Sequence, residues 1–243
     1  SAYREQMNYF ISLLVNADNA IDVAHGERCP LPFQSCMVED CIGRGKSLQE
    51  GGAIYNYGTM DVYGGLFEDN LAYFGGALFN YRRLNMYHAT VQNNQAIAIG
   101  GAIYIPNSTA AYTNIATETD KINPYVLFAN NTSGENGGAI YARHVIDIGN
   151  AVFENNQNAS GYGGAIYSGG IQMTMEGTVF RNNTSASNGG ALHVTTANGD
   201  EETVELTADK VTFVGNTATK NGGAMYVSTD IRVRLTDATF TDN

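Results

Sequence analysis

Apolar and polar positions alternate in short runs along most of the chain, and from about residue 46 onward no run follows the 3.6-residue period of a helix. Residues 145–148 (VIDI) and 231–235 (IRVRL) are two such runs. Alternation that includes β-branched residues is typical of β-strands, because successive side chains point to opposite faces of a sheet. The pattern therefore predicts a chain of many short strands.

A pentapeptide consisting of Gly-Gly, Ala, an aliphatic residue and an aromatic residue or His recurs throughout this region. Its copies begin at Gly51, Gly75, Gly100, Gly137, Gly163, Gly189 and Gly222. Self-similarity at a spacing of 20–50 residues is the signature of an architecture in which repeats stack on one another. Each unit of such an array contacts mainly its two neighbours.

A second motif, Phe-x-x-Asn, precedes most of the Gly-Gly pairs. It begins at Phe67, Phe128, Phe153, Phe180, Phe213 and Phe240, and Val91 starts a variant copy. The steps between these positions are 24, 37, 25, 27, 33 and 27 residues. A step of about 24–27 residues that holds three short strands is one turn of a parallel β-helix. We therefore expect an all-β, right-handed, single-stranded parallel β-helix with three strands per coil and about 8–9 coils.

Domain boundaries follow from where the repeats begin. Residues 46–243 are expected to form the β-helix, with loop insertions near 106–124 and 195–202 where the steps are long. Residues 1–45 are less regular and are expected to form an irregular coil or a cap. Cys29, Cys36 and Cys41 lie there, and one local disulfide among them would suit an oxidising compartment. Ser1 is not a start Met, so we interpret the chain as a piece of a longer protein.

Stacking of equivalent residues assigns a role to each motif position. The aliphatic residue and the Phe should point inward and form two apolar ladders. The motif Asn should lie at a turn, where Asn tolerates left-handed backbone and where stacked amides can bond from coil to coil. The Gly-Gly pair should mark a second corner with a crowded site or a positive φ. The expected Asn ladder comprises Asn70, Asn94, Asn131, Asn156, Asn183 and Asn216.

The fifth position of the pentapeptide should face outward and form an aromatic strip. The strip comprises Tyr55, Phe79, Tyr104, Tyr141, Tyr167, His193 and Tyr226. One interpretation is that the rings stack and stabilise the pairing of coils. The other is that they form a binding strip for a protein or a polysaccharide, because exposed apolar patches often mark contact sites.

The net charge of −11 argues against partners that need a basic patch, namely nucleic acid and anionic membrane surfaces. No run of 18 apolar residues occurs, so no transmembrane helix is expected. The acidity is explained by a solvated surface or by calcium binding, although the Gly-Gly-x-Gly-x-Asp repeat of calcium-binding β-rolls is missing. We expect no metal and no cofactor.

Catalytic patterns are weak. The carboxylates Asp61, Asp147, Glu176, Glu205 and Asp237 come one per coil, which fits a solvent-facing column or, alternatively, acid–base work on a sugar chain. No Ser-His-Asp order or HExxH motif occurs, so no catalytic residue is predicted. Ice binding would need a regular Thr column, which the irregular positions Thr59, Thr174, Thr207 and Thr236 do not supply.

Together, the Gly-Gly-Ala-Ile/Leu and Phe-x-x-Asn motifs resemble the repeats of chlamydial polymorphic outer-membrane proteins over about residues 50–243. The resemblance implies a secreted or surface β-helix of the kind that autotransporters export and that acts in adhesion. We therefore expect a non-catalytic, extracellular or cell-surface structural or adhesive module that belongs to a longer protein or assembly. Its expected partners are a surface protein or polysaccharide, or further copies joined end to end. The alternative is a carbohydrate-active β-helix that cleaves or binds polysaccharide.

Overall fold

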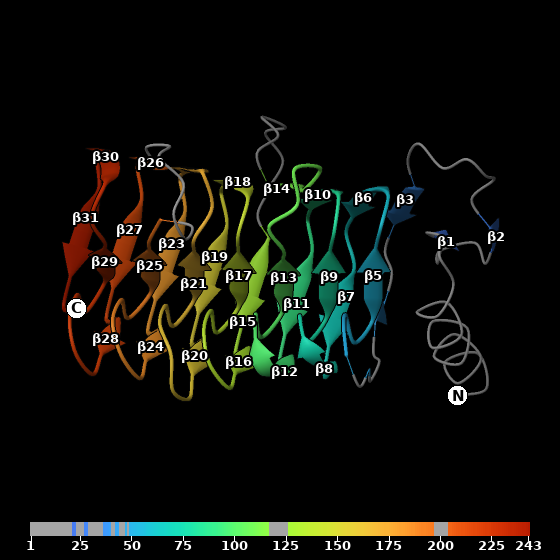
Figure 1. Cartoon of the computed structure of the whole chain (residues 1–243), viewed down its shortest axis with the longest axis horizontal. Coiled ribbons are helices and arrows are strands. Elements are labelled where there is room, and N and C mark those ends of the chain that lie inside the picture. The colour runs from blue at the N-terminus through green and yellow to red at the C-terminus, as the bar shows by residue number, and fades with distance from the viewer. Residues whose placement is uncertain are drawn as a thin grey trace.

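The computed structural model describes residues 49–116, 126–196 and 204–243, together with residue 47. It also describes the backbone of four short N-terminal segments, 21–22, 27–28, 36–39 and 42–43. Apart from an antiparallel pair formed by β1 (Ile21–Asp22) and β2 (Glu27–Arg28), all described strands lie in four parallel sheets. Figure 1 shows these strands side by side along the long axis of the molecule, from β5 to β30.

We name the four sheets by the residues that characterise them. The aromatic sheet, which carries the Gly-Gly-Ala motifs, comprises β5 (Ile54–Asn56), β9 (Leu78–Asn80), β13 (Ile103–Ile105), β17 (Ile140–Ala142), β21 (Ile166–Ser168), β25 (Leu192–Val194) and β29 (Met225–Val227). The polar sheet comprises β3 (Cys36–Glu39), β6 (Thr59–Tyr63), β10 (Arg83–Tyr87), β14 (Tyr112–Ile115), β18 (Val145–Gly149), β22 (Gln172–Glu176), β26 (Val204–Asp209) and β30 (Ile231–Thr236).

The remaining two sheets lie on either side of the Phe-x-x-Asn turn. The Phe sheet comprises β4 (Ile42–Gly43), β7 (Leu66–Glu68), β11 (Thr90–Gln92), β15 (Leu127–Ala129), β19 (Val152–Glu154), β23 (Val179–Arg181), β27 (Thr212–Val214) and β31 (Thr239–Thr241). The short sheet comprises β8 (Leu71–Phe74), β12 (Gln95–Ile99), β16 (Thr132–Ser133), β20 (Gln157–Asn158), β24 (Thr184–Ser185) and β28 (Thr217–Ala218).

The molecule is therefore a parallel β-helix, but the expected number of strands per coil was wrong. Each full coil has four strands, because a short strand follows the motif Asn before the Gly-Gly corner. Most strands of the short sheet have only two residues, such as Thr132–Ser133, and two residues are too few to show alternation. The seven strands of the aromatic sheet give about seven coils instead of 8–9, since β3 and β4 extend only the polar and Phe sheets.

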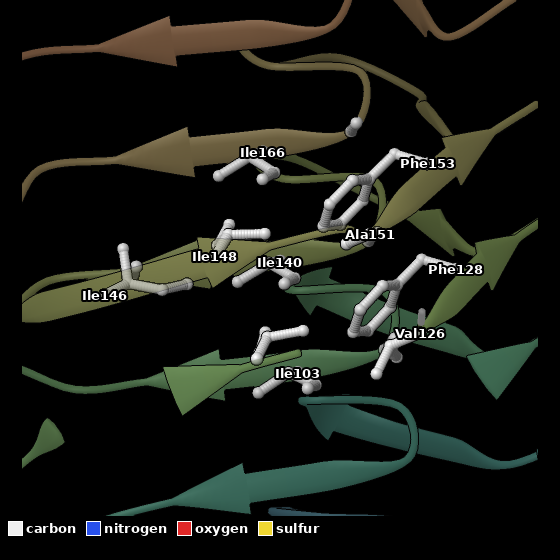
Figure 2. Packing of buried hydrophobic residues seen from close by; sticks show 14 of the residues in the cluster. Ile103, Val126, Phe128, Ile140, Ile146, Ile148, Ala151, Phe153 and Ile166 are labelled. Atoms are coloured by element: carbon white, nitrogen blue, oxygen red, sulfur yellow. The ribbon is translucent and has the colours of Figure 1, made fainter. Parts of the chain in front are cut away.

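Equivalent residues of successive coils pair in register, as the repeats predict. Ile103 pairs with Ile140, and Ile140 pairs with Ile166. Phe128 pairs with Phe153 in the Phe sheet, and their rings stack with centroids 4.7 Å apart. All five of these side chains are at most 1% exposed, and Figure 2 shows them in one continuous core. Each such buried side chain stabilises the fold by about 1.5–3 kcal/mol.

The Gly-Gly corner needs glycine at both positions, for different reasons. The first glycine has a positive φ, +65° at Gly137, which side chains rarely adopt. At the second glycine the backbone of the next coil lies too close for any side chain. A Cβ on Gly138 would be 1.9 Å from the carbonyl oxygen of Gly164.

The Phe-x-x-Asn turn differs from the expectation in one respect. The left-handed residue is the one before the motif Asn, as in Asn130 (φ 55°), Asn155 (φ 54°) and Asn182 (φ 55°). The motif Asn that follows, such as Asn131 or Asn156, does not have a positive φ, and its side chain is buried inside the coil. The expectation was that the motif Asn would both adopt the left-handed backbone and form the amide ladder.

Several expectations concern the N-terminal part of the chain or its long steps. Cys29 and Cys41 lie outside the described residues, and only the backbone of Cys36 is described, so the predicted disulfide stays a prediction. Within the range 106–124, β14 pairs with β10 and β18, while residues 117–125 and 197–203 lie outside the described part. In the described part, no helix is long and apolar enough to cross a membrane.

Candidate functional site

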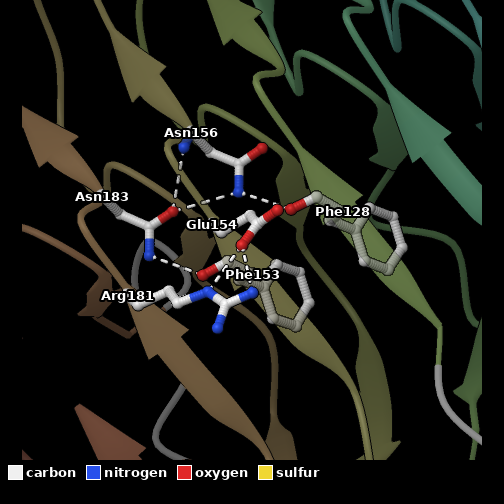
Figure 3. A network of polar contacts seen from close by, with 6 residues as sticks. All are labelled: Phe128, Phe153, Glu154, Asn156, Arg181 and Asn183. Atoms are coloured by element: carbon white, nitrogen blue, oxygen red, sulfur yellow. Dashed lines mark hydrogen bonds and ion pairs between the residues drawn. The ribbon is translucent and has the colours of Figure 1, made fainter. Parts of the chain in front are cut away.

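The Asn ladder is a buried line of side-chain amides that joins all the coils. In the coil centred on Asn156, the side-chain Nδ2 donates to Oδ1 of Asn183 at 3.0 Å and to the carbonyl oxygen of Phe128 at 2.9 Å. Its Oδ1 accepts from the backbone N–H and from Nδ2 of Asn131, at 3.0 and 2.9 Å. Figure 3 shows part of this arrangement. An amide has two donors and two acceptor sites, so every hydrogen-bonding position of this side chain is used.

The same pattern extends from the first described coil to the last. Each ladder Asn donates from Nδ2 to the next, over 2.7 Å from Asn70 to Asn94 and over 2.7 Å from Asn216 to Asn243. The ladder residues are at most 1% exposed between these ends. Chains of hydrogen bonds strengthen one another in a low-dielectric interior. We therefore conclude that the Asn ladder stabilises the stacking of the coils.

The aromatic strip forms a second continuous line, outside the core. Neighbouring rings lie with centroids 4.8–5.4 Å apart along the whole set, from Tyr55 to Tyr226. Tyr141 and Tyr167 are almost parallel, with 2° between their planes. Each interior ring of the strip thus has another ring against both faces.

Flanking side chains cover much of the strip. Phe74 packs against Tyr104 with centroids 5.4 Å apart, and Tyr162 stacks on His193 at 4.7 Å. Tyr141 is 8% exposed and His193 is 6% exposed. Burial raises the pKa of Tyr167 to about 12, so its hydroxyl keeps its proton. A sugar that stacks on an aromatic ring needs a free ring face. A binding role for the strip stays a prediction, and only its ring edges and hydroxyls could serve that role.

His193 within the strip should make stability depend on pH. Burial lowers its pKa from 6.5 to about 4, so the folded chain binds this proton more weakly than the unfolded chain. The unfolded state then gains protons first as the pH falls, and stability should decrease between about pH 6.5 and pH 4. We expect a loss of about 1–2 kcal/mol, reduced by solvent screening. Urea unfolding at pH 7 and pH 4.5 measures this loss.

Two variants test whether His193 causes this loss of stability. His193→Phe keeps a ring in the strip, as Phe79 does in another copy, and should reduce the loss strongly. The part that remains comes from His144, whose pKa burial also lowers. His88→Asn changes an exposed histidine and should leave the loss unchanged. An equal pH dependence in His193→Phe and the parent chain would contradict the assignment.

The carboxylates of the polar sheet do not form one cluster. Asp61 and Asp147 share a column, but Asn85 and Asn114 of the two intervening coils lie between them. Glu205 belongs to another column and forms an ion pair with Arg232 at 2.9 Å, while Asp237 lies at a turn with a φ of 48°. In the described part of the chain, no three or more His, Cys, Asp or Glu side chains are placed to hold a metal ion.

The stacking of the coils brings together one set of basic residues that the sequence analysis did not group. Arg82, Arg83, Arg143 and His144 all lie where a strand of the aromatic sheet leads into the polar sheet. Arg82 and Arg83 lie between or in β9 and β10, and the other two lie between β17 and β18. The signal that could have found them is their common position directly after a Gly-Gly-Ala strand.

Two comparisons with known proteins match the β-helix. The family described as Chlamydia polymorphic membrane protein repeat matches residues 125–143, 177–195 and 210–227. The probable autotransporter YfaL of Escherichia coli (strain K12) is 36% identical over 115 residues, which is 42% of this chain and 9% of that protein. No solved structure matches the chain.

Other matches fall on the N-terminal part. The family described as pyruvate formate lyase-like matches residues 1–66. Trans-4-hydroxy-L-proline dehydratase of Clostridioides difficile is 36% identical over 55 residues, or 23% of this chain and 7% of that enzyme. (2S)-3-sulfopropanediol dehydratase of Klebsiella oxytoca is 44% identical over 52 residues, or 21% of this chain and 6% of that enzyme. The chain thus spans less than a tenth of the length of each of these three relatives.

The two kinds of match meet in the first coil. Residues 51–66 belong to the pyruvate formate lyase-like match, yet Ile54 and Tyr55 pair in register with Leu78 and Phe79 of the next repeat. This segment therefore stacks as a coil like the others. We conclude that this chain forms a parallel β-helix in which three segments, residues 125–143, 177–195 and 210–227, match the repeat of chlamydial polymorphic membrane proteins.

Proposed function

We propose that the chain is a non-catalytic structural and adhesive segment of a larger cell-surface protein. The observation that carries the proposal is the Asn ladder, which runs through matched repeats as an unbroken line of buried hydrogen bonds. A solenoid joined in this way from coil to coil forms a stiff rod with long, regular outer faces. Such a rod can hold a binding face away from the surface that anchors it.

Similarity to polymorphic membrane protein repeats and to a probable autotransporter supports a location at the outer membrane or cell surface. The net charge of −11 keeps such a rod soluble and discourages unspecific binding to nucleic acid. We propose an exposed partner on another surface, either a protein or a polysaccharide.

Adhesion can be measured directly with the purified chain. Fluorescent beads coated with the chain should be retained on cultured epithelial cells under flow, and free chain should compete with them. The controls are beads coated with albumin and beads coated with the Gly138→Ala variant, whose added methyl group would lie 1.9 Å from the carbonyl oxygen of Gly164 and should prevent folding. Retention no higher than that of albumin-coated beads would contradict the adhesive proposal.

The alternative of a carbohydrate-active protein has two parts, cleavage and binding. The carboxylates Asp61 and Asp147 are three coils apart in one column, or about 14 Å at the usual spacing of parallel strands. Paired carboxylates of glycosidases lie about 5–10 Å apart. Glu176 and Asp209 do pair in register on adjacent coils, so the distance argument applies only to Asp61 and Asp147. We propose that the chain binds polysaccharide and that Asp61 and Asp147 do not cleave it.

A further inference from the structure

The arginine corner, which we define as Arg82, Arg83 and Arg143 with the tyrosines that they contact, lies along one edge of the β-helix. Backbone hydrogen bonds align it from coil to coil. The N–H of Tyr112 donates to the carbonyl of Arg82 at 2.8 Å, and the N–H of Arg143 donates to the carbonyl of Ile105 at 2.9 Å. The register places Arg83 in one column with Tyr112 and Val145. Arg143 lies two residues before Val145, so it is at the same edge but not in the same column.

The three arginines are not neutralised within the described part of the chain. Arg181, Lys210 and Arg232 each form an ion pair with a carboxylate. No ion pair of this kind joins a described carboxylate to Arg82, Arg83 or Arg143. The edge also holds a carboxylate, because Asp147 accepts a hydrogen bond at 2.6 Å from the hydroxyl of Tyr112, the ring that Arg83 covers. The three arginines are nonetheless a group of cations in a chain with a net charge of −11. A positive local field raises the concentration of anions beside it.

Aromatic contacts hold these guanidinium groups in place without neutralising them. Arg82 lies over the ring of Tyr57, 5.5 Å from its centroid, and Arg83 lies over the ring of Tyr112 at 5.2 Å. Nη1 of Arg143 donates to the hydroxyl of Tyr141 at 3.4 Å. Cation–π contacts order a guanidinium group and leave its N–H donors available. Ordered arginines can then bind sulfate or carboxylate oxygens bidentately.

The absence of a side chain at Gly169 leaves room for the side chain of Arg143. A Cβ on Gly169 of the next coil would lie 3.3 Å from Cδ of Arg143, so the arginine stem lies across a position that has no side chain. Arg143 is half-buried, whereas Arg82 and Arg83 are exposed. The guanidinium groups thus lie at a surface formed by backbone and tyrosine.

The spacing of the arginines indicates a polymeric ligand. Arg82 and Arg83 belong to the second coil and Arg143 to the fourth, which places them about 10 Å apart along the axis. A single small anion cannot reach both positions, but a chain with an acidic group on successive sugars can. Nucleic acid is less suitable, because the chain is acidic overall and because the rings of Tyr57 and Tyr112 are already covered by guanidinium groups on which bases would otherwise stack.

We propose that the arginine corner binds an acidic polysaccharide, with its sulfate or carboxylate groups on Arg82, Arg83 and Arg143 and its chain along the β-helix axis. This assignment rests on the proposed adhesive function, because it names the partner of the rod. It differs from a role of the aromatic strip, whose interior rings have no free face.

Binding of labelled oligosaccharides to the purified chain tests the proposal by fluorescence anisotropy in about 0.1 M salt, where surface charge still acts over about 10 Å. Heparin and polygalacturonate oligosaccharides separate sulfate from carboxylate recognition. Dextran is the neutral control, and single-stranded oligothymidylate is the nucleic-acid arm. We expect at least one acidic oligosaccharide to bind in preference to dextran and oligothymidylate.

Variants then locate the site. The double variant Arg82→Gln/Arg83→Gln and the single variant Arg143→Gln should each weaken binding by about tenfold or more, because each removes charge-assisted hydrogen bonds to the acidic groups of the ligand. Arg143→Lys should recover part of the loss. Arg234→Gln removes the same charge from the exposed last coil and should change binding by less than about twofold. Near-UV circular dichroism checks that each variant keeps its stacked tyrosines.

Three results would overturn the arginine corner: no binding of either acidic oligosaccharide, an equal loss in Arg234→Gln, or equally tight binding of oligothymidylate. Adhesion of coated beads is an independent readout. Beads that adhere equally well with Arg82→Gln/Arg83→Gln would exclude this corner while leaving the adhesive function in place. If acidic oligosaccharides bound in solution but the coated beads did not adhere, the adhesive function would be excluded and the arginine corner would remain as a binding site.

Discussion

Gly138→Ala is expected to prevent stable folding of the β-helix, or to lower its free energy of unfolding by about 4 kcal/mol or more. The added methyl group would lie 1.9 Å from the carbonyl oxygen of Gly164 and 2.6 Å from the backbone nitrogen of Gln157. Both are backbone atoms of the next coil, which cannot move away as a flexible side chain can. Urea unfolding followed by far-UV circular dichroism measures the effect.

Gly58→Ala is the matched control for this substitution. A Cβ on Gly58 would find its nearest neighbour, Oδ1 of Asn56, at 4.0 Å, and the backbone there does not have a positive φ. Its free energy of unfolding should stay within about 0.5 kcal/mol of the parent chain. A Gly138→Ala variant as stable as Gly58→Ala would show that the coils are not packed backbone to backbone at the Gly-Gly corner.

Asn156→Ala is expected to lower the free energy of unfolding by about 3–5 kcal/mol. The substitution leaves the carbonyl oxygen of Phe128 and the amide of Asn131 without the partner that each has now, and a buried polar group without a partner costs about 1–3 kcal/mol. Asn156→Asp should be at least as harmful, although it keeps the shape, because its second oxygen would face two acceptor oxygens. Urea unfolding at pH 7 compares both variants with the parent chain.

Gln157→Ala provides the control at the neighbouring position. Gln157 is exposed on the short sheet, and its truncation should change the free energy of unfolding by less than about 0.5 kcal/mol. If Asn156→Ala were no more harmful than Gln157→Ala, the ladder would not be what joins the coils.

The register of the fold could be predicted from the sequence because the repeats mark it at several positions. The Gly-Gly-Ala motif placed Ile140 beside Ile103 and Ile166, and the Phe motif placed Phe153 beside Phe128 and Phe180. Large apolar side chains at fixed spacing have one arrangement that buries all of them. Their alignment therefore does not depend on the lengths of the loops between them.

The short sheet could not be predicted because three of its two-residue strands, β16, β20 and β24, have polar inward side chains. Ser133, Asn158 and Ser185 are at most 5% exposed, yet Ser and Asn are the residues that usually indicate a loop. Asn158 satisfies its carbonyl oxygen with the backbone N–H groups of Gly161 and Ala186, at 3.2 and 3.0 Å. The first bond is local and the second joins two coils, and neither leaves a periodic pattern in the sequence.

The candidate sites were harder to predict than the fold. Outward alternation correctly placed Tyr104 and Tyr141 on the same face of the sheet. It left open whether the rings stack or bind a partner, and the structure shows these two rings stacked. The arginine corner depends on two coils that are separated by the 37-residue step from Val91 to Phe128. The alignment of Arg83 with Val145, which brings Arg82 beside His144, appears only once β14 is placed between β10 and β18.

Distances between spin labels along one column test the stacked coils most directly. Glu68, Arg181, Val214 and Thr241 belong to one column of the Phe sheet, through the pairing of Glu68, Gln92, Ala129, Glu154, Arg181, Val214 and Thr241. With the three native cysteines changed to Ser, labels on Glu68→Cys and one further position are four, five or six coils apart. Pulsed electron paramagnetic resonance should give distances of about 19, 24 and 29 Å, rising by about 4.8 Å per coil. Distances that do not rise in equal steps, or that follow the unequal residue separations, would contradict the parallel β-helix.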